Sequence, residues 1–216
     1  MIDIESIRTF VTHTQEWQGF GWNILTFGTA LAAGTVALQS WGLSKQIATS
    51  SSPQGTSVVS VTNKSIAAAY YVTVFTYGLA IGGLVLCAGL VLGALQFVIA
   101  AQLWRIKGFT LQEWCVVAGC IGIAVAAFIT PWQAQLFFLT AFILLPPGLA
   151  MQSVEMWRAK SRRGLAPQDS LASLITCAIW IVYGAALGSW LVALSSVLYA
   201  ALYGSTLFLW YKYREQ

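Results

Sequence analysis

Long uncharged stretches of mostly apolar residues, separated by short polar segments, run along almost the whole 216-residue chain. A helix that spans a bilayer needs about 20 such residues. The uncharged stretches 65–104 and 170–211 are about twice that length, so each must fold back once. The glycine-containing pairs Gly82-Gly83 and Gly188-Ser189 are the predicted turns. The pattern therefore predicts seven spanning helices, over residues 21–44, 65–81, 84–104, 114–129, 136–156, 171–187 and 190–210.

The composition indicates that lipid is the solvent for most of the surface. Hydrophobic residues make up 58% of the chain and charged residues 8%, whereas a soluble domain carries about 25% charged residues. These values exclude a soluble enzyme and a disordered chain. No Asp, Glu, Lys, Arg or His lies in the interior of a predicted span. We therefore expect no proton relay or ion-pair switch, no metal, no cofactor and no enzymatic activity.

The basic residues predict the orientation in the membrane. With the N-terminus outside, ten of the eleven lysines and arginines fall on the cytosolic side, and Arg8 alone lies outside. The ten are Lys45, Lys64, Arg105, Lys107, Arg158, Lys160, Arg162, Arg163, Lys212 and Arg214. Cytosolic loops of membrane proteins carry such an excess, so we expect an extracytosolic N-terminus and a cytosolic C-terminus. The net charge of +4 is then explained by attraction to the inner leaflet, without a nucleic-acid partner.

The second half of the chain resembles the first at a constant offset of 106 residues. This offset pairs Tyr77-Gly78 with Tyr183-Gly184, Gly42 with Gly148, Gln46 with Gln152, Gly82 with Gly188, and Leu103-Trp104 with Leu209-Trp210. A unit of three helices begins and ends on opposite faces, so one additional helix between two units gives them the same orientation. We therefore expect an all-α polytopic membrane protein: an outer N-terminal segment (1–20), a first triple-helix repeat (21–108), an inversion linker helix (109–132) and a second, parallel triple-helix repeat (133–213).

This plan and two motifs of the second repeat resemble the SWEET, SemiSWEET and PQ-loop transporter family. The stretch 151–167, MQSVEMWRAKSRRGLAP, is similar to the end of the family's first helix and its basic inner loop. The run Trp180-Ile181-Val182-Tyr183-Gly184 is similar to its Trp-x-x-Tyr-Gly signature. The resemblance covers 136–213 well, and 30–107 mainly through the internal repeat. It implies two triple-helix bundles that move a small solute by alternating access.

Several positions differ from the family pattern. Lys45 and Met151 stand where the family has a proline before glutamine, and Val74 replaces the signature tryptophan in the first repeat. Leu90 and Ser196 stand where sugar-transporting members carry asparagine. The first hypothesis is facilitative, uncoupled transport of a small neutral polar solute, with a sugar as the leading candidate and a vitamin or amino acid as alternatives. The second is a non-transporting protein of the same fold, such as a cargo receptor or an assembly factor.

The expected solute site lies near mid-membrane, between the repeats. Trp180 is its leading candidate, because tryptophan is unusual in the middle of a span unless its N–H finds a partner. Helix packing is the alternative for this residue. The other candidates are small polar side chains and the position that the repeat relates to Trp180: Ser196, Ser195, Val74, Gln96, Cys177 and Thr73. The alternative for the serines is a hydrogen bond to their own helix backbone.

Two further groups are expected to gate this site. Tyr77 and Tyr183 lie one turn toward the outside, and the resemblance implies that they form the outer gate; the membrane interface is the alternative. Gln46 and Gln152 mark the inner ends of the first helix in each repeat. Pro147 lies inside a predicted helix, where a proline releases a carbonyl and allows a hinge, with a static bend as the alternative.

The expected partners are a small neutral solute and the lipid bilayer. Small residues such as Gly89 and Gly93 permit close helix packing. The sequence leaves open whether that packing is within one chain or in a homo-oligomer.

Overall fold

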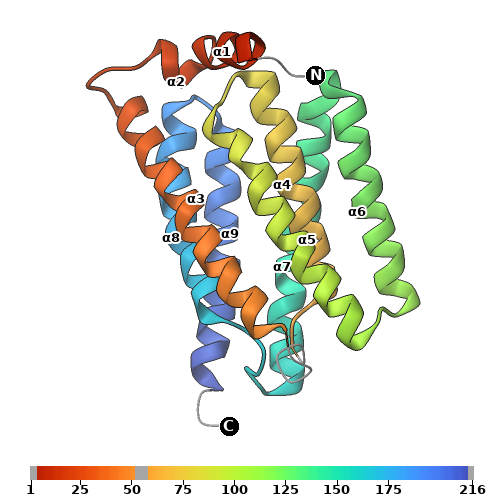
Figure 1. Ribbon diagram of the computed structural model, residues 1–216. Helices are drawn as coiled ribbons and strands as arrows, with labels where there is room; N and C mark the ends of the chain where they lie inside the picture. Colours follow the sequence, from red (N-terminus) through yellow and green to blue (C-terminus); the bar gives the residue numbers. More distant parts are fainter. Residues whose placement is uncertain (1–3, 52–57, 214–216) are drawn as a thin grey trace.

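The computed structural model describes residues 4–51 and 58–213, and all regular structure within them is helical (Figure 1). In this part of the chain, two short helices, α1 (Ile4–Thr12) and α2 (Gln15–Gln18), precede seven long ones. The long helices are α3 (Ile24–Thr49), α4 (Val61–Ile81), α5 (Gly89–Lys107), α6 (Leu111–Ile129), α7 (Ala134–Ala159), α8 (Pro167–Ala186) and α9 (Trp190–Lys212). The 3-10 helices η2 (Val85–Ala88) and η3 (Pro131–Gln133) lead into α5 and α7. The all-helical prediction is confirmed.

Six helices of the described residues are long and apolar enough to cross a membrane: α3, α5, α6, α7, α8 and α9. This is the build of a polytopic helical membrane protein. The seventh predicted span, 65–81, falls in α4, which is not one of the six. Its first turns contain Asn63 and Lys64, and it packs against α5, α6 and α7. Because protein covers so much of α4, its surface does not need to be uniformly apolar.

Two helices, α4 and α8, each begin four residues earlier than the sequence predicted, which brings two charged residues into the bundle. α4 begins at residue 61 instead of 65, because the Ser60 hydroxyl caps it by accepting from the Asn63 N–H at 3.2 Å. α8 begins at Pro167 instead of residue 171, since a proline fits the first helical position, where no N–H is needed. Lys64 and Asp169, which the prediction placed in loops, therefore lie within helices.

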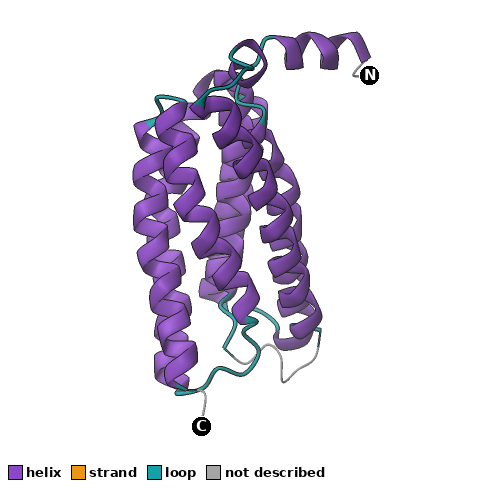
Figure 2. Cartoon of the chain, turned by 90° about the vertical axis from the view of Figure 1, so that its left-hand side faces the viewer, coloured by secondary structure: helices purple, strands orange, loops and turns teal. Residues whose placement is uncertain are grey.

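The long helices run side by side between two ends (Figures 1 and 2). α3 packs along α8, and α4 packs along α7. α5 lies against α4 and α3, while α9 lies against α8 and α7. α6 packs on α4 at the edge of the bundle (Figure 1). The two sequence halves therefore meet mainly through the α3–α8 and α4–α7 contacts, and α6 contacts α4 and, less extensively, α7.

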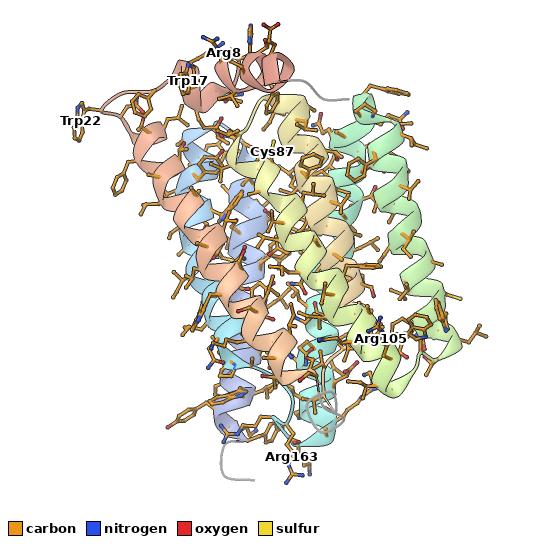
Figure 3. All side chains as sticks on the ribbon, viewed as in Figure 1. Arg8, Trp17, Trp22, Cys87, Arg105 and Arg163 are labelled. Atoms are coloured by element: carbon orange, nitrogen blue, oxygen red, sulfur yellow. The ribbon has the colours of Figure 1, made fainter. Side chains whose placement is uncertain are left out.

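The two ends of the bundle differ in character. α1 and α2 lie across one of them, the α1 end, where the backbone and side-chain N–H groups of Gln15 donate to carbonyls at the end of α4 at 2.9 and 3.1 Å. Trp17 and Trp22 are exposed there (Figure 3), as in an aromatic belt at a membrane interface. The opposite end, the basic end, carries Arg105 and Arg163 among other cationic side chains (Figure 3).

The glycines of the two Tyr-Gly pairs set how closely neighbouring helices approach. A Cβ added to Gly78 would lie 2.6 Å from the Leu86 Cβ, and one added to Gly184 would lie 2.7 Å from the Ala193 backbone nitrogen. Neither neighbour is the end of a flexible side chain, so a larger residue forces helices apart. The glycine requirement at both positions is therefore steric.

We expect Gly184→Ala to lower the free energy of unfolding by about 1–3 kcal/mol through overpacking. Gly204→Ala is the matched control, because a Cβ there meets nothing within 4 Å. That control should stabilise α9 by up to about 1 kcal/mol through higher helix propensity. Chemical denaturation in detergent micelles measures both changes, and equal stability of the two variants would contradict the steric argument.

Candidate functional site

A small cavity of about 50 Å³ lies inside the bundle where α3, α4, α7, α8 and α9 meet. Six of its sixteen lining residues are aromatic, and its walls carry several hydroxyl groups. The lining residues with a polar side-chain atom are Gln39, Tyr70, Tyr71, Thr176, Cys177, Trp180, Ser195, Ser196, Tyr199 and Tyr203. Ligand pockets usually measure about 300 Å³ or more, whereas about 15 Å³ suffices for one water molecule. The cavity in this structure is therefore large enough for water only.

Five of the seven predicted site residues line this cavity: Trp180, Ser195, Ser196, Val74 and Cys177. The other two do not. Thr73 is buried, and its hydroxyl donates to the Tyr70 carbonyl at 2.8 Å. Gln96 is buried in a smaller pocket nearer the basic end, together with Lys64 and Asp169.

The polar atoms of Trp180 and the two serines already have partners. Trp180 donates its Nε1–H to the Thr35 hydroxyl at 3.1 Å, so the indole is held across the α3–α8 contact. Ser195 and Ser196 both donate to the Val192 carbonyl, at 2.7 and 2.9 Å. This is the backbone alternative considered above, and it leaves the serine oxygens able to accept. Trp180 therefore offers an apolar face, and the serines offer acceptors.

Of the four tyrosines of the cavity, the sequence prediction considered Tyr199 and Tyr203 and missed Tyr70 and Tyr71. Tyr70 and Tyr71 of α4 form part of the wall, and the Gln39 amide donates to the Tyr71 hydroxyl at 3.2 Å. The Thr176 Oγ1 is buried and has no hydrogen-bond partner among the described residues, whereas the buried Tyr199 hydroxyl interacts with that of Tyr70. An unpaired group such as Thr176 Oγ1 costs free energy until something pairs with it. Two adjacent tyrosines in mid-span are the signal that the sequence offered.

Contacts between elements close the α1 end of the cavity. The Tyr183 hydroxyl donates to Glu16 Oε1 at 2.5 Å, and the Val85 N–H donates to the same oxygen at 3.3 Å. Tyr77 stacks flat on Phe138 of α7, with ring centroids 4.7 Å apart. Both predicted gate tyrosines thus lie at this end. Glu16 of α2 also takes part in this closure. The sequence did not identify it, because its polar segment looked exposed and its contact with Tyr183 forms only when α2 folds over the bundle.

Gln46 fastens α3 to the segment that precedes α8 at the basic end. It is fully buried, donates to the Gly164 carbonyl at 2.9 Å and accepts from the Ala166 N–H at 2.8 Å. One amide thereby satisfies the buried Ala166 N–H and the partly buried Gly164 carbonyl.

Gln152 makes the corresponding pair of bonds from α7 to the segment that precedes α4. It donates to the Val58 carbonyl at 2.6 Å and accepts from the Ser60 N–H at 3.0 Å. Its two partners lie 106 residues before those of Gln46, and the two glutamines are separated by the same 106 residues. The basic end is therefore held by two equivalent crossed contacts.

A buried ion pair lies near these glutamines. Lys64 Nζ of α4 is 2.7 Å from Asp169 Oδ2 of α8, and the two side chains are 4% and 9% exposed. Both residues lie in the first turn of their helices, just before the predicted spans 65–81 and 171–187, because α4 and α8 each begin one turn earlier than predicted. Each charge compensates the other, so the pair brings no net charge into the bundle.

Pro147 and its neighbour Pro146 lie inside the continuous helix α7. Neither proline has an N–H, so the carbonyls of Phe142 and Ile143, four residues earlier, lose their usual partners. The next residue, Gly148, packs against Ile66 of α4, where an added Cβ would lie 3.0 Å from its side chain. This weakened stretch of α7 therefore faces α4.

Among the described residues, no group of three or more His, Cys, Asp and Glu side chains is arranged to hold a metal ion. No protein-family model, curated protein or solved structure matches this chain. The function is therefore inferred from its own residues and geometry.

Proposed function

We propose that this protein is a facilitative transporter of a small neutral polar solute, with a sugar as the first candidate. The observation that carries the proposal is the central cavity, which is lined by both sequence halves and is closed at each end by contacts between them. Alternating access requires such a site between two bodies that can separate at one end at a time. Trp180 would stack on the solute, while Ser195, Ser196, Thr176 and Tyr199 would exchange hydrogen bonds with it.

The helix contacts support two parallel repeats, 21–108 and 133–213, with α6 as the linker within 109–132. The α3–α8 contact corresponds to the α7–α4 contact when each helix is replaced by its counterpart 106 residues away. The same replacement relates α3–α5 to α7–α9, and α4–α5 to α8–α9. The bonds of Gln46 and Gln152 follow the same rule. This arrangement favours membership of the SWEET and PQ-loop family, with α4 as a seventh span.

In the proposed orientation the basic end faces the cytosol and the α1 end faces outside. Opening outward would separate Tyr77 from Phe138 and Tyr183 from Glu16. Opening inward would break the Lys64–Asp169 pair and the crossed glutamine contacts. The ion pair is internally neutral, so it does not require a co-transported ion, and we propose an uncoupled mechanism.

Uptake into liposomes tests the proposal, using radiolabelled neutral sugars, vitamins and amino acids. We expect Trp180→Ala to reduce the initial rate for the transported solute by roughly tenfold or more, since the lost aromatic contact is comparable to burying one large side chain. Trp157→Ala is the matched control, because Trp157 is on α7 and 60% exposed. The control should retain the wild-type rate.

Two outcomes would count against this function. Absence of flux for every solute, in protein shown to be folded, would reject transport and favour the non-transporting alternative of a cargo receptor or assembly factor. The small volume of the cavity, about 50 Å³, is the observation that favours that alternative. Flux that depends on the direction of an imposed pH gradient would reject the uncoupled mechanism.

A further inference from the structure

A groove of about 380 Å³ lies on the flank of the bundle between α4, α5 and α6, apart from the central cavity. Small residues keep it open, among them Ala68, Gly93 and Ala124. α5 and α6 meet at the basic end, where the rings of Trp104 and Trp114 are 5.8 Å apart, and diverge toward the α1 end (Figure 1). The groove is therefore a slot between α5 and α6, and the Trp104–Trp114 pair closes it at the basic end.

The length of the groove matches one leaflet of a bilayer. On α5 its lining residues extend from Leu90 to Ala100, which at 1.5 Å per residue corresponds to about 15 Å. The hydrocarbon core of a bilayer is about 30 Å thick, so one leaflet contributes about 15 Å. Trp104 and Trp114 are 52% and 42% exposed, as expected for indoles at the level of the lipid headgroups. Counted from Trp104, the lining residues of α5 begin about 6 Å away at Ala100 and end about 21 Å away at Leu90. The slot therefore begins in the leaflet at the basic end and reaches just past the bilayer midplane.

One hydroxyl lines this otherwise apolar or weakly polar groove. Ser65 lies in the second turn of α4, is 5% exposed, and its Oγ has no hydrogen-bond partner among the described residues. Other buried hydroxyls in the helices, such as those of Thr73 and Ser195, donate to carbonyls of their own helix. Ser65 therefore holds an unused donor at the wall of an apolar slot, which a ligand oxygen would satisfy.

A cation lies beyond the same end of the groove. Arg105 follows Ala100 by five residues on α5, and Figure 3 shows it at the basic end of the bundle. Its side chain is exposed and has no hydrogen-bond or ion-pair partner in the described parts of the chain. The nearest acidic side chain in sequence, Glu113, is engaged in the capping box of α6 with Thr110. Arg105 is thus available to an external anion.

We propose that this groove binds one acyl chain of an anionic glycerophospholipid from the leaflet at the basic end. In this proposal the acyl chain lies in the slot, an ester carbonyl of the lipid accepts a hydrogen bond from Ser65, and the phosphate lies near Arg105. Apolar burial supplies the affinity, and the cation supplies the preference for an anionic lipid. The proposal does not depend on transport.

Native mass spectrometry of the full chain, titrated with phosphatidylglycerol or phosphatidylcholine of identical acyl chains, tests it. Ala124→Phe fills the groove and should weaken phosphatidylglycerol binding by roughly tenfold, the effect of displacing about two methylene groups. Ala118→Phe, on the same helix but outside the groove, should leave binding unchanged. Arg105→Gln should remove the preference for phosphatidylglycerol, whereas Arg158→Gln, an exposed cation on α7, should retain it.

A variant-free measurement accompanies these titrations. A phosphatidylglycerol with a diazirine in its acyl chain should label peptides of α5 and α6 in the wild-type protein. Labelling confined to other helices would overturn the proposal. Equal binding by Ala124→Phe and Ala118→Phe would overturn it as well, as would a cross-link from this groove to a second copy of the chain.

Discussion

Replacing Asp169 with asparagine should lower the free energy of unfolding by about 3–5 kcal/mol, because Lys64 would remain buried without its counter-charge. For a chain of this size the melting temperature should fall by about 2–4 °C for each kcal/mol. The side chains of the pair are 4% and 9% exposed, so water cannot compensate the remaining ammonium group without opening the bundle. Thermal and chemical unfolding in detergent micelles measure the effect.

The double variant Lys64→Met with Asp169→Leu separates charge from packing. Replacing both members of a buried ion pair by apolar groups of similar size is often neutral or stabilising. We therefore expect the double variant to be more stable than either single variant and close to the wild type. If Asp169→Asn changed stability by less than about 1 kcal/mol, as for an exposed pair, the pair would not be buried as the structure has it.

Replacing Gln46 with leucine should destabilise the protein by about 2–4 kcal/mol, because one buried and one partly buried backbone group lose their partners, and a buried group costs about 1–3 kcal/mol when unpaired. Those groups are the Gly164 carbonyl and the Ala166 N–H. Gln152→Leu removes the equivalent two bonds on the other side and should have a similar effect. Agreement between the two variants would support the twofold relation of the repeats.

Gln102→Leu is the matched control for these glutamine variants. Gln102 lies on α5, and its side-chain oxygen is buried without a partner among the described residues. Leucine there removes an unsatisfied acceptor, so stability should stay constant or rise. Guanidinium or urea titration of the three variants, read by tryptophan fluorescence, gives the comparison. A loss for Gln102→Leu as large as that for Gln46→Leu would mean that volume, rather than hydrogen bonding, sets the effect.

Under the transport proposal the same glutamine variants have a second consequence. Both lie at the basic end, so their loss should ease opening there and not at the α1 end. The steric match of Gly78 and Gly184 to the following helices is expected to be unaffected, because it lies toward the α1 end. For these glutamine variants, the expected loss of stability and the expected effect on transport can therefore be tested independently of each other.

The apolar pattern predicted the helices well because membrane helices have a simple requirement, about 20 residues with few charges. It also identified Gln46, Gln152 and five residues of the cavity wall, since internal repetition and an isolated mid-span tryptophan are visible in one dimension. Gln96 and Thr73, which were predicted for the same site, do not line this cavity. A helix period assigns residues to a face, but neighbouring helices decide whether that face meets the cavity, another pocket or a backbone carbonyl.

The sequence by itself determined that this chain is built of long apolar helices and that its cations gather at one end, because both follow from composition along the chain. Only the tertiary structure decided which polar groups meet. Lys64 and Asp169 are 105 residues apart, and Tyr183 and Glu16 are 167 apart. It also showed that Gly89 and Gly93 pack against α4 of the same chain. A charge can be buried only beside its partner, and that partner is supplied by the packing of distant helices.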